Sequence, residues 1–353
     1  MQLVLSGNWL DKRGFYEAEI EDIKFYNSLD DIKEITPLSF ALFSYHLAKQ
    51  ILDLNIKKPK LPAVLIMKIK KFKKINPKLE TTKLILKGKT LKDDEFKAGV
   101  SKILSLIEDG TVYQINLTNR FDFELLGGPL SLFFNFYKNQ PVPYGFFLDV
   151  GNFFIISGSM ELFLEKIGRT IISKPIKGTS KSLKFLQNSE KDRAENIMIT
   201  DMMRNDIGRI SQIGSVSVPE LFKITRYRTL YQMHSTVEGK TDKSIIEIIK
   251  QTFPPASVTG APKRKAVEMI DMLESHNREY YCGCAGIIRN ETDFTLSVLI
   301  RTAIGLKNNL SYYAGCGIVW DSDPESELNE LYLKVEAFYN QRYNLNKHRG
   351  GVK

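Results

Sequence analysis

One lysine in this chain stands where its side chain could attack carbon. Lys177 lies in the segment PIKGT at 175–179, where a proline and a glycine indicate a loop that presents the amine. A lysine acts as a nucleophile only as the neutral amine, which a partly desolvated pocket or a neighbouring cation favours. A lysine between proline and glycine is more often a solvated turn residue, so the chemistry depends on what the fold places beside it.

A carboxyl group is the first expected partner of this amine. The sequence between Glu161 and Lys177 alternates apolar and polar residues, as in a β-hairpin. Such a hairpin would bring the acid and the amine to one end of a sheet. The pair then suits general acid catalysis for a departing group, together with nucleophilic attack by the amine.

Two further acids lie at helical spacing near the carboxyl end. Residues 325–339 predict a helix, because their apolar residues recur with a helical period. Glu327 and Glu330 then fall on one face, together with Lys334. Two interpretations stay open: an exposed face with an ion pair of residues i and i+4, or carboxylates that neutralise a hard divalent cation.

Several sequence blocks, in order, carry a resemblance to a known family. They are the PIKGT block with Lys177, KDRAEN at 191–196, FPPASVTGAPK at 253–263 and DSDPESELNE at 321–330. Together they resemble the signature blocks of the chorismate-utilising enzymes, a family that contains anthranilate synthase component I, isochorismate synthase and aminodeoxychorismate synthase component I. The lysine of the PIKGT block resembles the aminodeoxychorismate branch, because the anthranilate enzymes carry alanine there.

The resemblance implies a role for each residue of the site. Glu195 and Glu330 correspond to the family's metal ligands, with Glu327 as a nearby contributor, and a bound Mg²⁺ would hold the ring carboxylate of chorismate. Arg301 would hold the enolpyruvyl carboxylate with its fork, and His234 would position the departing hydroxyl. Further substrate contacts are implied for Thr179, Gly260, Ala261, Tyr313, Gly315, Gly317 and Lys334.

The implied reaction replaces the ring hydroxyl of chorismate by an amino group. Protonated Glu161 would act as general acid while Lys177 adds to the ring, and ammonia would then expel the lysine to give 4-amino-4-deoxychorismate. None of the three cysteines stands in the context of a glutaminase nucleophile, so a separate glutamine amidotransferase subunit is expected to supply ammonia. The nearest alternative is another chorismate enzyme, one that makes anthranilate or isochorismate.

The order of helix, strand and hairpin signals predicts an α+β architecture. The signals mix without regular alternation of strand and helix, which argues against a doubly wound sheet or a barrel. With the resemblance, we expect a two-lobed fold of large, mixed but mainly antiparallel sheets, packed together and flanked by helices. Residues 1–90 form a short amino-terminal region of that sandwich, with helical spacing at 38–54, and residues 91–345 form the catalytic domain, which begins with an amphipathic helix at 93–109.

Composition predicts a cytoplasmic globular protein. The 353 residues are 43% hydrophobic, with no apolar run long enough for a membrane span and no secretory signal at the start. Three cysteines are expected to be reduced and buried. Most of the net charge of +9 comes from a lysine-rich segment at 57–78, which lacks interleaved aromatic residues. A solvated or strand-protecting face is therefore expected, and nucleic-acid binding is the alternative from a different class.

Overall fold

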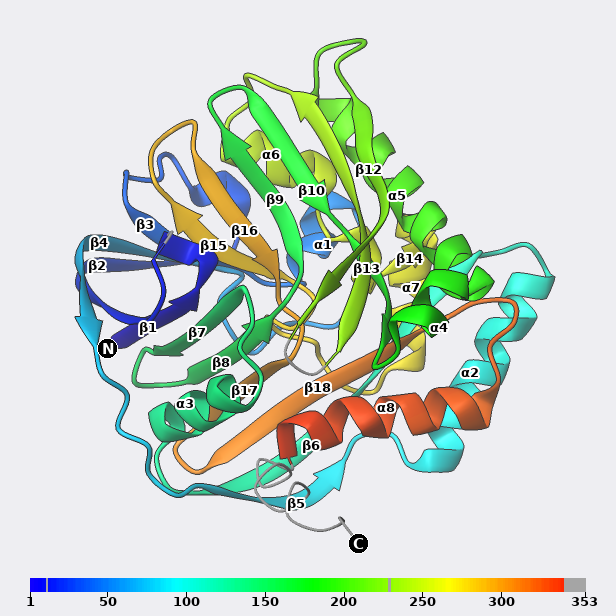
Figure 1. Ribbon diagram of the computed structural model, residues 1–353, viewed down its shortest axis with the longest axis horizontal. Coiled ribbons are helices and arrows are strands. Elements are labelled where there is room, and N and C mark those ends of the chain that lie inside the picture. Colours follow the sequence, from blue (N-terminus) through cyan, green and yellow to red (C-terminus); the bar gives the residue numbers. More distant parts are fainter. Residues whose placement is uncertain (11, 228–229, 340–353) are drawn as a thin grey trace, which may run out of the picture.

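The strands of the protein form one connected network that spreads into two arms. The computed structural model describes residues 1–10, 12–227 and 230–339. Every strand pair among these residues is antiparallel, in line with the predicted mainly antiparallel sheets but without their parallel part. Both arms start at β2 (Phe15–Tyr26), which pairs with β1 on one side and β4 on the other. Figure 1 shows the arms as two groups of strands, with β9, β10 and β13 above and β8, β17, β18 and β6 below.

The first arm ends at the strand that carries Lys177. It continues from β4 through β3, β15, β16, β9 and β10 to β13, which pairs with both β11 and β12. The bounds of these strands are β3 Ser39–Phe43, β4 Val64–Ile75, β9 Leu162–Ile167, β10 Thr170–Lys174, β11 Ile176–Ser180, β12 Ser217–Arg226, β13 Tyr231–Lys240, β15 Cys284–Ile288 and β16 Phe294–Val298.

The second arm ends at the strands that carry the glycines of the predicted site. It continues from β1 through β7, β8, β17 and β18 to β6, which also pairs with β5 and β14. The bounds of these strands are β1 Gln2–Gly7, β5 Lys83–Lys89, β6 Gln114–Leu126, β7 Tyr144–Asp149, β8 Phe154–Ser159, β14 Gly260–Ala261, β17 Thr302–Leu306 and β18 Asn309–Ile318.

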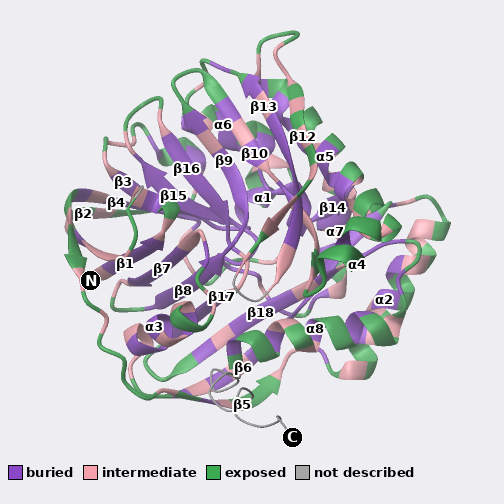
Figure 2. Ribbon diagram, in the orientation of Figure 1, coloured by how far each residue is buried: buried purple, intermediate pink, exposed green. Residues whose placement is uncertain are grey.

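Helices cover the faces of both arms. α2 and α8 pack against β6 and β18, α5 packs against β11 and β13, and α7 packs against β6 and β14. Figure 2 shows that the sheets are largely buried, while the outward faces of α2, α5 and α8 carry exposed residues. These helices therefore pack their apolar faces on the sheets. No helix in the described part of the chain is both long and apolar enough to cross a membrane. The bounds are α1 Leu47–Ile51, α2 Asp93–Glu108, α3 Pro129–Asn139, α4 Leu183–Asn188, α5 Glu190–Ile210, α6 Ile245–Thr252, α7 Lys263–Leu273 and α8 Pro324–Tyr339, with short 3-10 turns at Asn8–Leu10, Leu29–Asp31 and Ala256–Val258.

The predicted elements nearest to the chemistry are confirmed, and one near the amino terminus was wrong. The helices at 93–109 and 325–339 are α2 and α8, and the predicted hairpin is β9–β10. The helix predicted over 38–54 is instead the strand β3 followed by α1. All of β3 is buried between β4 and β15, and a strand buried on both faces shows an apolar run that its spacing cannot distinguish from a helix.

The amino-terminal region is part of the common sheet. Its strands β1 to β4 pair with one another and with β7 and β15 from later in the chain, so residues 1–90 contribute to both arms. The predicted catalytic domain, 91–345, runs past residue 339 to positions outside the described residues. The three cysteines are free and buried.

Candidate active site

The β9–β10 hairpin places Glu161 close to Lys177. Glu161 directly precedes β9, and the register pairs Leu162 with Lys174, so the chain returns beside Glu161 as it enters β11. Glu161 is 4% exposed. This burial raises the pKa of its carboxyl to about 7, against opposing effects from the Ser257 hydroxyl and the charge of Lys177. Near neutral pH, Glu161 can therefore donate a proton.

Lys177 reaches from the first arm to the second. Its Nζ lies 3.8 Å from Glu195 Oε2, and its side chain is 12% exposed. A Cβ on Gly317 would come within 2.9 Å of this Nζ and 2.6 Å of Gln114 Nε2. The missing side chain of Gly317 is therefore what makes room for the amine and the amide.

Gln114 is a site residue that the sequence reasoning missed. It is buried at the start of β6, and its Oε1 has no hydrogen-bond partner among the described residues. A buried amide oxygen without a partner is costly, so it favours a ligand that donates a hydrogen bond there. The alternation of residues 113–123 predicted the strand, but spacing gave no reason to single out this glutamine.

Each acid of the predicted metal site forms an ion pair with a lysine. Burial raises the pKa of Glu195, whereas Lys334 holds the pKa of Glu330 below its ordinary value. Glu327 is buried and also accepts a hydrogen bond from Ser322 Oγ at 2.7 Å. The three pairs are Glu195 with Lys177 at 3.8 Å, Glu327 with Lys191 at 3.5 Å and Glu330 with Lys334 at 2.7 Å.

Two of these carboxylates fit a hard divalent cation. Oxygens of Glu327 and Glu330 lie within 4.8 Å of each other and of Cys316 Sγ. Burial raises the pKa of the Cys316 thiol to about 12, so the thiol stays neutral and is a poor ligand for magnesium. Among the described residues, Glu195 is not part of this closely spaced group. The structure thus pairs Glu330 with Glu327 first, where the resemblance gave Glu327 the lesser role.

Arg301 and Lys334 lie together beside β18. Arg301 stands in the turn between β16 and β17 with φ +52°. Its guanidinium donates to the Lys334 carbonyl at 3.3 Å, and no carboxylate of the described residues lies within 4.0 Å of it. Lys334 Nζ donates to the Gly315 carbonyl at 2.7 Å. The guanidinium therefore keeps donors available for an anion.

The segment at Gly260 and Ala261 holds β6 at Gln114. These two residues form β14, which pairs with Ile115 and Gln114. Gly260 has φ +154°, and a Cβ there would lie 2.1 Å from the Gln114 carbonyl oxygen, so no larger residue fits. Gly260 and Ala261, both implied as substrate contacts, thus stand next to the glutamine that lies beside Lys177.

The structure does not bring His234 to this cluster. The register pairs His234 with Ile176, so their side chains share a face of the sheet, and the register shifts between Ile176 and Thr179, where Lys177 lies. His234 Nε2 lies 2.9 Å from Thr225 Oγ1, and burial lowers the pKa of the ring. The contacts recorded for His234 among the described residues include neither Glu161 nor Lys177.

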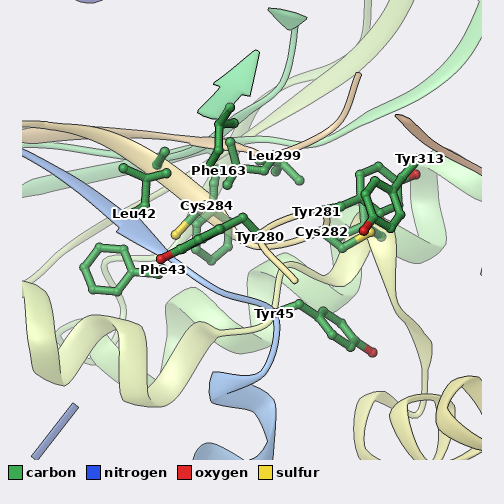
Figure 3. Close-up of a cluster of buried hydrophobic side chains, with 14 of the residues drawn as sticks. Leu42, Phe43, Tyr45, Phe163, Tyr280, Tyr281, Cys282, Cys284, Leu299 and Tyr313 are labelled. Atoms are coloured by element: carbon green, nitrogen blue, oxygen red, sulfur yellow. The ribbon is translucent and has the colours of Figure 1, made fainter. Parts of the chain in front are cut away.

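Tyr313 and Thr179 contact other residues. The ring of Tyr313 stacks on Tyr281, with 5.2 Å between the ring centroids and 17° between the ring planes. Figure 3 shows the two rings side by side. Tyr313 lines a cavity of about 640 Å³ whose described lining includes neither Glu161 nor Lys177. Thr179 is exposed and lies 3.5 Å from Gln232 Nε2. Strand alternation puts Tyr313 on the same face as Gly315 and Gly317, but farther along β18.

The fold of two antiparallel arms that meet at these buried acids and amines is also found in proteins of known structure. Anthranilate synthase component I from Streptococcus pneumoniae has a TM-score of 0.75, with 23% identity over 96% of this chain and 90% of that chain. The menaquinone-specific isochorismate synthase MenF from Escherichia coli has a TM-score of 0.76, with 17% identity over 96% of this chain and 88% of that chain. These likenesses establish the two-armed α+β fold.

The sequence comparisons establish the family. Residues 39–340 match the chorismate binding enzyme family, and this chain belongs to it. Anthranilate synthase component 1 of Saccharolobus solfataricus is 34% identical over 260 residues, which are 70% of this chain and 62% of that protein. Aminodeoxychorismate synthase component 1 of Escherichia coli is 35% identical over 252 residues, 68% of this chain and 56% of that protein. The aligned part thus spans less than two thirds of either relative.

Proposed function

We propose that this protein converts chorismate into 4-amino-4-deoxychorismate, with ammonia as the nitrogen source. One observation carries the proposal: a buried carboxyl that is protonated near neutral pH, Glu161, and the Lys177 amine lie together where the two arms meet. The likeness to the Escherichia coli protein named aminodeoxychorismate synthase component 1 supports it.

The two side chains divide the substitution into two steps. Glu161 donates its proton to the ring hydroxyl as the carbon–oxygen bond breaks and water leaves, while Lys177 Nζ forms a carbon–nitrogen bond to the ring. Lys177 must first lose a proton, because an ammonium has no lone pair. Ammonia then forms its own bond to the ring as the bond to Lys177 breaks, which restores the lysine.

The surrounding residues hold the reactants. Arg301 binds one carboxylate of chorismate, because its guanidinium has free donors. The unpartnered Oε1 of Gln114 accepts a hydrogen bond from the nitrogen that approaches the ring beside Lys177. Glu327 and Glu330, with Glu195 nearby, would hold Mg²⁺, which neutralises and orients the other carboxylate when bound.

Incubation with chorismate, Mg²⁺ and an ammonium salt tests the reaction, with mass analysis of the product and of the protein. Lys177→Ala is expected to lower amination by about a hundredfold or more, since it removes the attacking group. Lys181→Ala, at an exposed position on the same segment, is the matched control. An unchanged yield of the same product from Lys177→Ala would remove the lysine from the chemistry.

A second candidate is the formation of anthranilate. The likeness to the protein named anthranilate synthase component 1 favours it. The same incubation separates the two, because anthranilate is fluorescent and its formation releases pyruvate, whereas amination as proposed keeps the enolpyruvyl group. Anthranilate as the main product would replace the first proposal.

The ammonia is proposed to come from a separate glutamine amidotransferase subunit. Burial raises the pKa of Cys282 to about 12 and that of Cys284 well above its ordinary value, so neither thiol is a ready nucleophile. Purified alone, the protein is expected to use ammonium salts and not glutamine. Glutamine-dependent turnover by this polypeptide alone would contradict the proposal of a separate amidotransferase subunit.

A further inference from the structure

One lysine at the carboxylates differs from the other two. Lys177 is nearly buried against Gly317, and Lys334, 29% exposed, also donates to the Gly315 carbonyl. Lys191 is 45% exposed, and among the described residues its one ion-pair partner within 4.0 Å is Glu327. Of the three lysines, Lys191 is therefore the most exposed and the one held by the fewest other contacts.

The charge of Lys191 acts on all three acids of the site. It belongs to the first turn of α5, the helix that carries Glu195, and it pairs with Glu327 on α8 at 3.5 Å. Burial by itself would lower the pKa of Lys191, but Glu327, Glu195 and Glu330 together raise it. The side chain thus brings one full positive charge to two helices whose acids would otherwise repel each other.

We infer that Lys191 is a tethered counter-ion that holds the place of a divalent cation and moves into solvent when the metal binds. The inference rests on the metal site of the proposed function. An ammonium and a divalent cation repel strongly at a few ångströms, so both cannot occupy the same group of carboxylates at no cost. The half-exposed position and the flexible four-carbon stem of Lys191 let it withdraw.

The consequence is that Lys191 weakens metal binding while it stabilises the metal-free protein. Glu327 is 4% exposed at its side chain, so without a nearby cation its charge would be buried and poorly compensated. With Lys191 in place the acids are neutralised, and a metal must displace the ammonium before it binds. The lysine thus sets how much free metal the site needs.

Binding of Mn²⁺, a spectroscopic substitute for Mg²⁺, tests the inference directly. The concentration of unbound Mn²⁺ is measured from its electron paramagnetic resonance signal. Lys191→Met is expected to bind Mn²⁺ about tenfold more tightly than the unmodified protein, because the competing charge is gone. Lys191→Arg keeps the charge and is expected to bind less tightly than Lys191→Met. Lys184→Met, at an exposed position of α4, is the control and is expected to bind as the unmodified protein does.

Thermal unfolding with and without Mg²⁺ separates this role from a merely structural one. Without metal, Lys191→Met is expected to melt at a lower temperature than the unmodified protein, because the acids lose a counter-ion. Saturating Mg²⁺ is expected to remove that deficit. A deficit of the same size in both conditions would show that Lys191 only supports the fold, and would overturn the inference.

The outcomes also distinguish this inference from the proposals it rests on. If the unmodified protein binds Mn²⁺ and Lys191→Met binds it equally or more weakly, the inference is wrong and the metal site stands. If neither binds Mn²⁺, the metal site fails and the inference fails with it. Amination of chorismate is judged separately, by product analysis.

Discussion

The charge state of Glu161 couples both chemistry and stability to pH. Its pKa is about 7 in the folded protein against an ordinary value of 4.5, so the folded state keeps a proton that the unfolded chain releases. The stability that this proton contributes is complete below the unfolded pKa and is lost as pH rises through the folded pKa. The loss between pH 4.5 and 7 is about 3 kcal/mol.

Substitution by glutamine should remove this pH dependence. Glu161→Gln is expected to lose about 2–3 kcal/mol less unfolding free energy from pH 5 to 8 than the unmodified protein, and to lower amination by about a hundredfold or more. Urea unfolding at several pH values measures the first effect. Glu291→Gln, at an exposed position, is the control, and equal slopes for the Glu161 variant and the unmodified protein would contradict the assignment.

Adding a methyl group at Gly317 should lower catalysis with little effect on the stability of the fold. Gly317→Ala would place its Cβ 2.9 Å from Lys177 Nζ and 2.6 Å from Gln114 Nε2, both ends of flexible side chains. We expect a loss in kcat/KM of about a hundredfold with little change in stability, because a small displacement of a reacting group is costly. Gly208→Ala meets no atom within 4 Å and serves as the control. Full activity of the Gly317 variant would place the reacting atoms elsewhere.

At the scale of elements, one buried ion pair holds the two helices that frame the site. Lys263 at the start of α7 pairs with Asp206 of α5 at 2.6 Å and also donates to the Thr252 carbonyl at 2.7 Å. Burial lowers the pKa of Lys263 and raises that of Asp206, so the two charges depend on each other. This pair joins the helix that carries Glu195 to the segment that follows Gly260.

Removing one partner of this ion pair should destabilise the protein more than replacing both partners with apolar residues. Asp206→Ala leaves a buried ammonium without its partner and is expected to destabilise the protein by about 3–5 kcal/mol. The double variant Asp206→Leu with Lys263→Met should recover most of that loss, since it buries no charge. Urea unfolding of the two variants provides the measurement, and equal losses in both would show that packing, rather than charge, joins α5 to α7.

At the scale of the whole molecule, part of the excess of lysine lies on a face where it is paired with acids. The lysine-rich strand β4 lies beside β2, where Lys68 pairs with Glu21 and both Lys70 and Lys71 pair with Glu19. Beyond Lys68, β4 pairs with β2 and no longer with β3. The lysines therefore form a solvated face that is partly neutralised by the strand next to it.

Duplex DNA should bind this face weakly at physiological salt. Fluorescence anisotropy of a labelled duplex is expected to show little binding at about 0.15 M salt, because three lysines of β4 are already paired with carboxylates and no aromatic platform accompanies them. The double variant Glu19→Gln with Glu21→Gln should strengthen binding at low salt, since it frees the cations. Tight binding by the unmodified protein with a steep salt dependence would support the nucleic-acid alternative.

What could be predicted from the sequence was largely what neighbouring residues decide. The hairpin between Glu161 and Lys177 and the two helices followed from periodicity, because side-chain spacing along a helix or strand is fixed by local geometry. The face on which His234 lies could not be predicted, because it depends on the register of β11 and β13 and on the register shift within that pair.

The sequence by itself determined the family, the order of its motifs and the residue types able to supply a proton, an amine and acidic ligands. The tertiary structure decided which of them meet: Lys177 with Gln114 at Gly317, Glu327 with Glu330 and Cys316, and a separate lysine for each acid. These contacts join residues far apart in the chain. They arise where the two antiparallel arms meet, and the spacing of residues along the chain does not predict contacts between the arms.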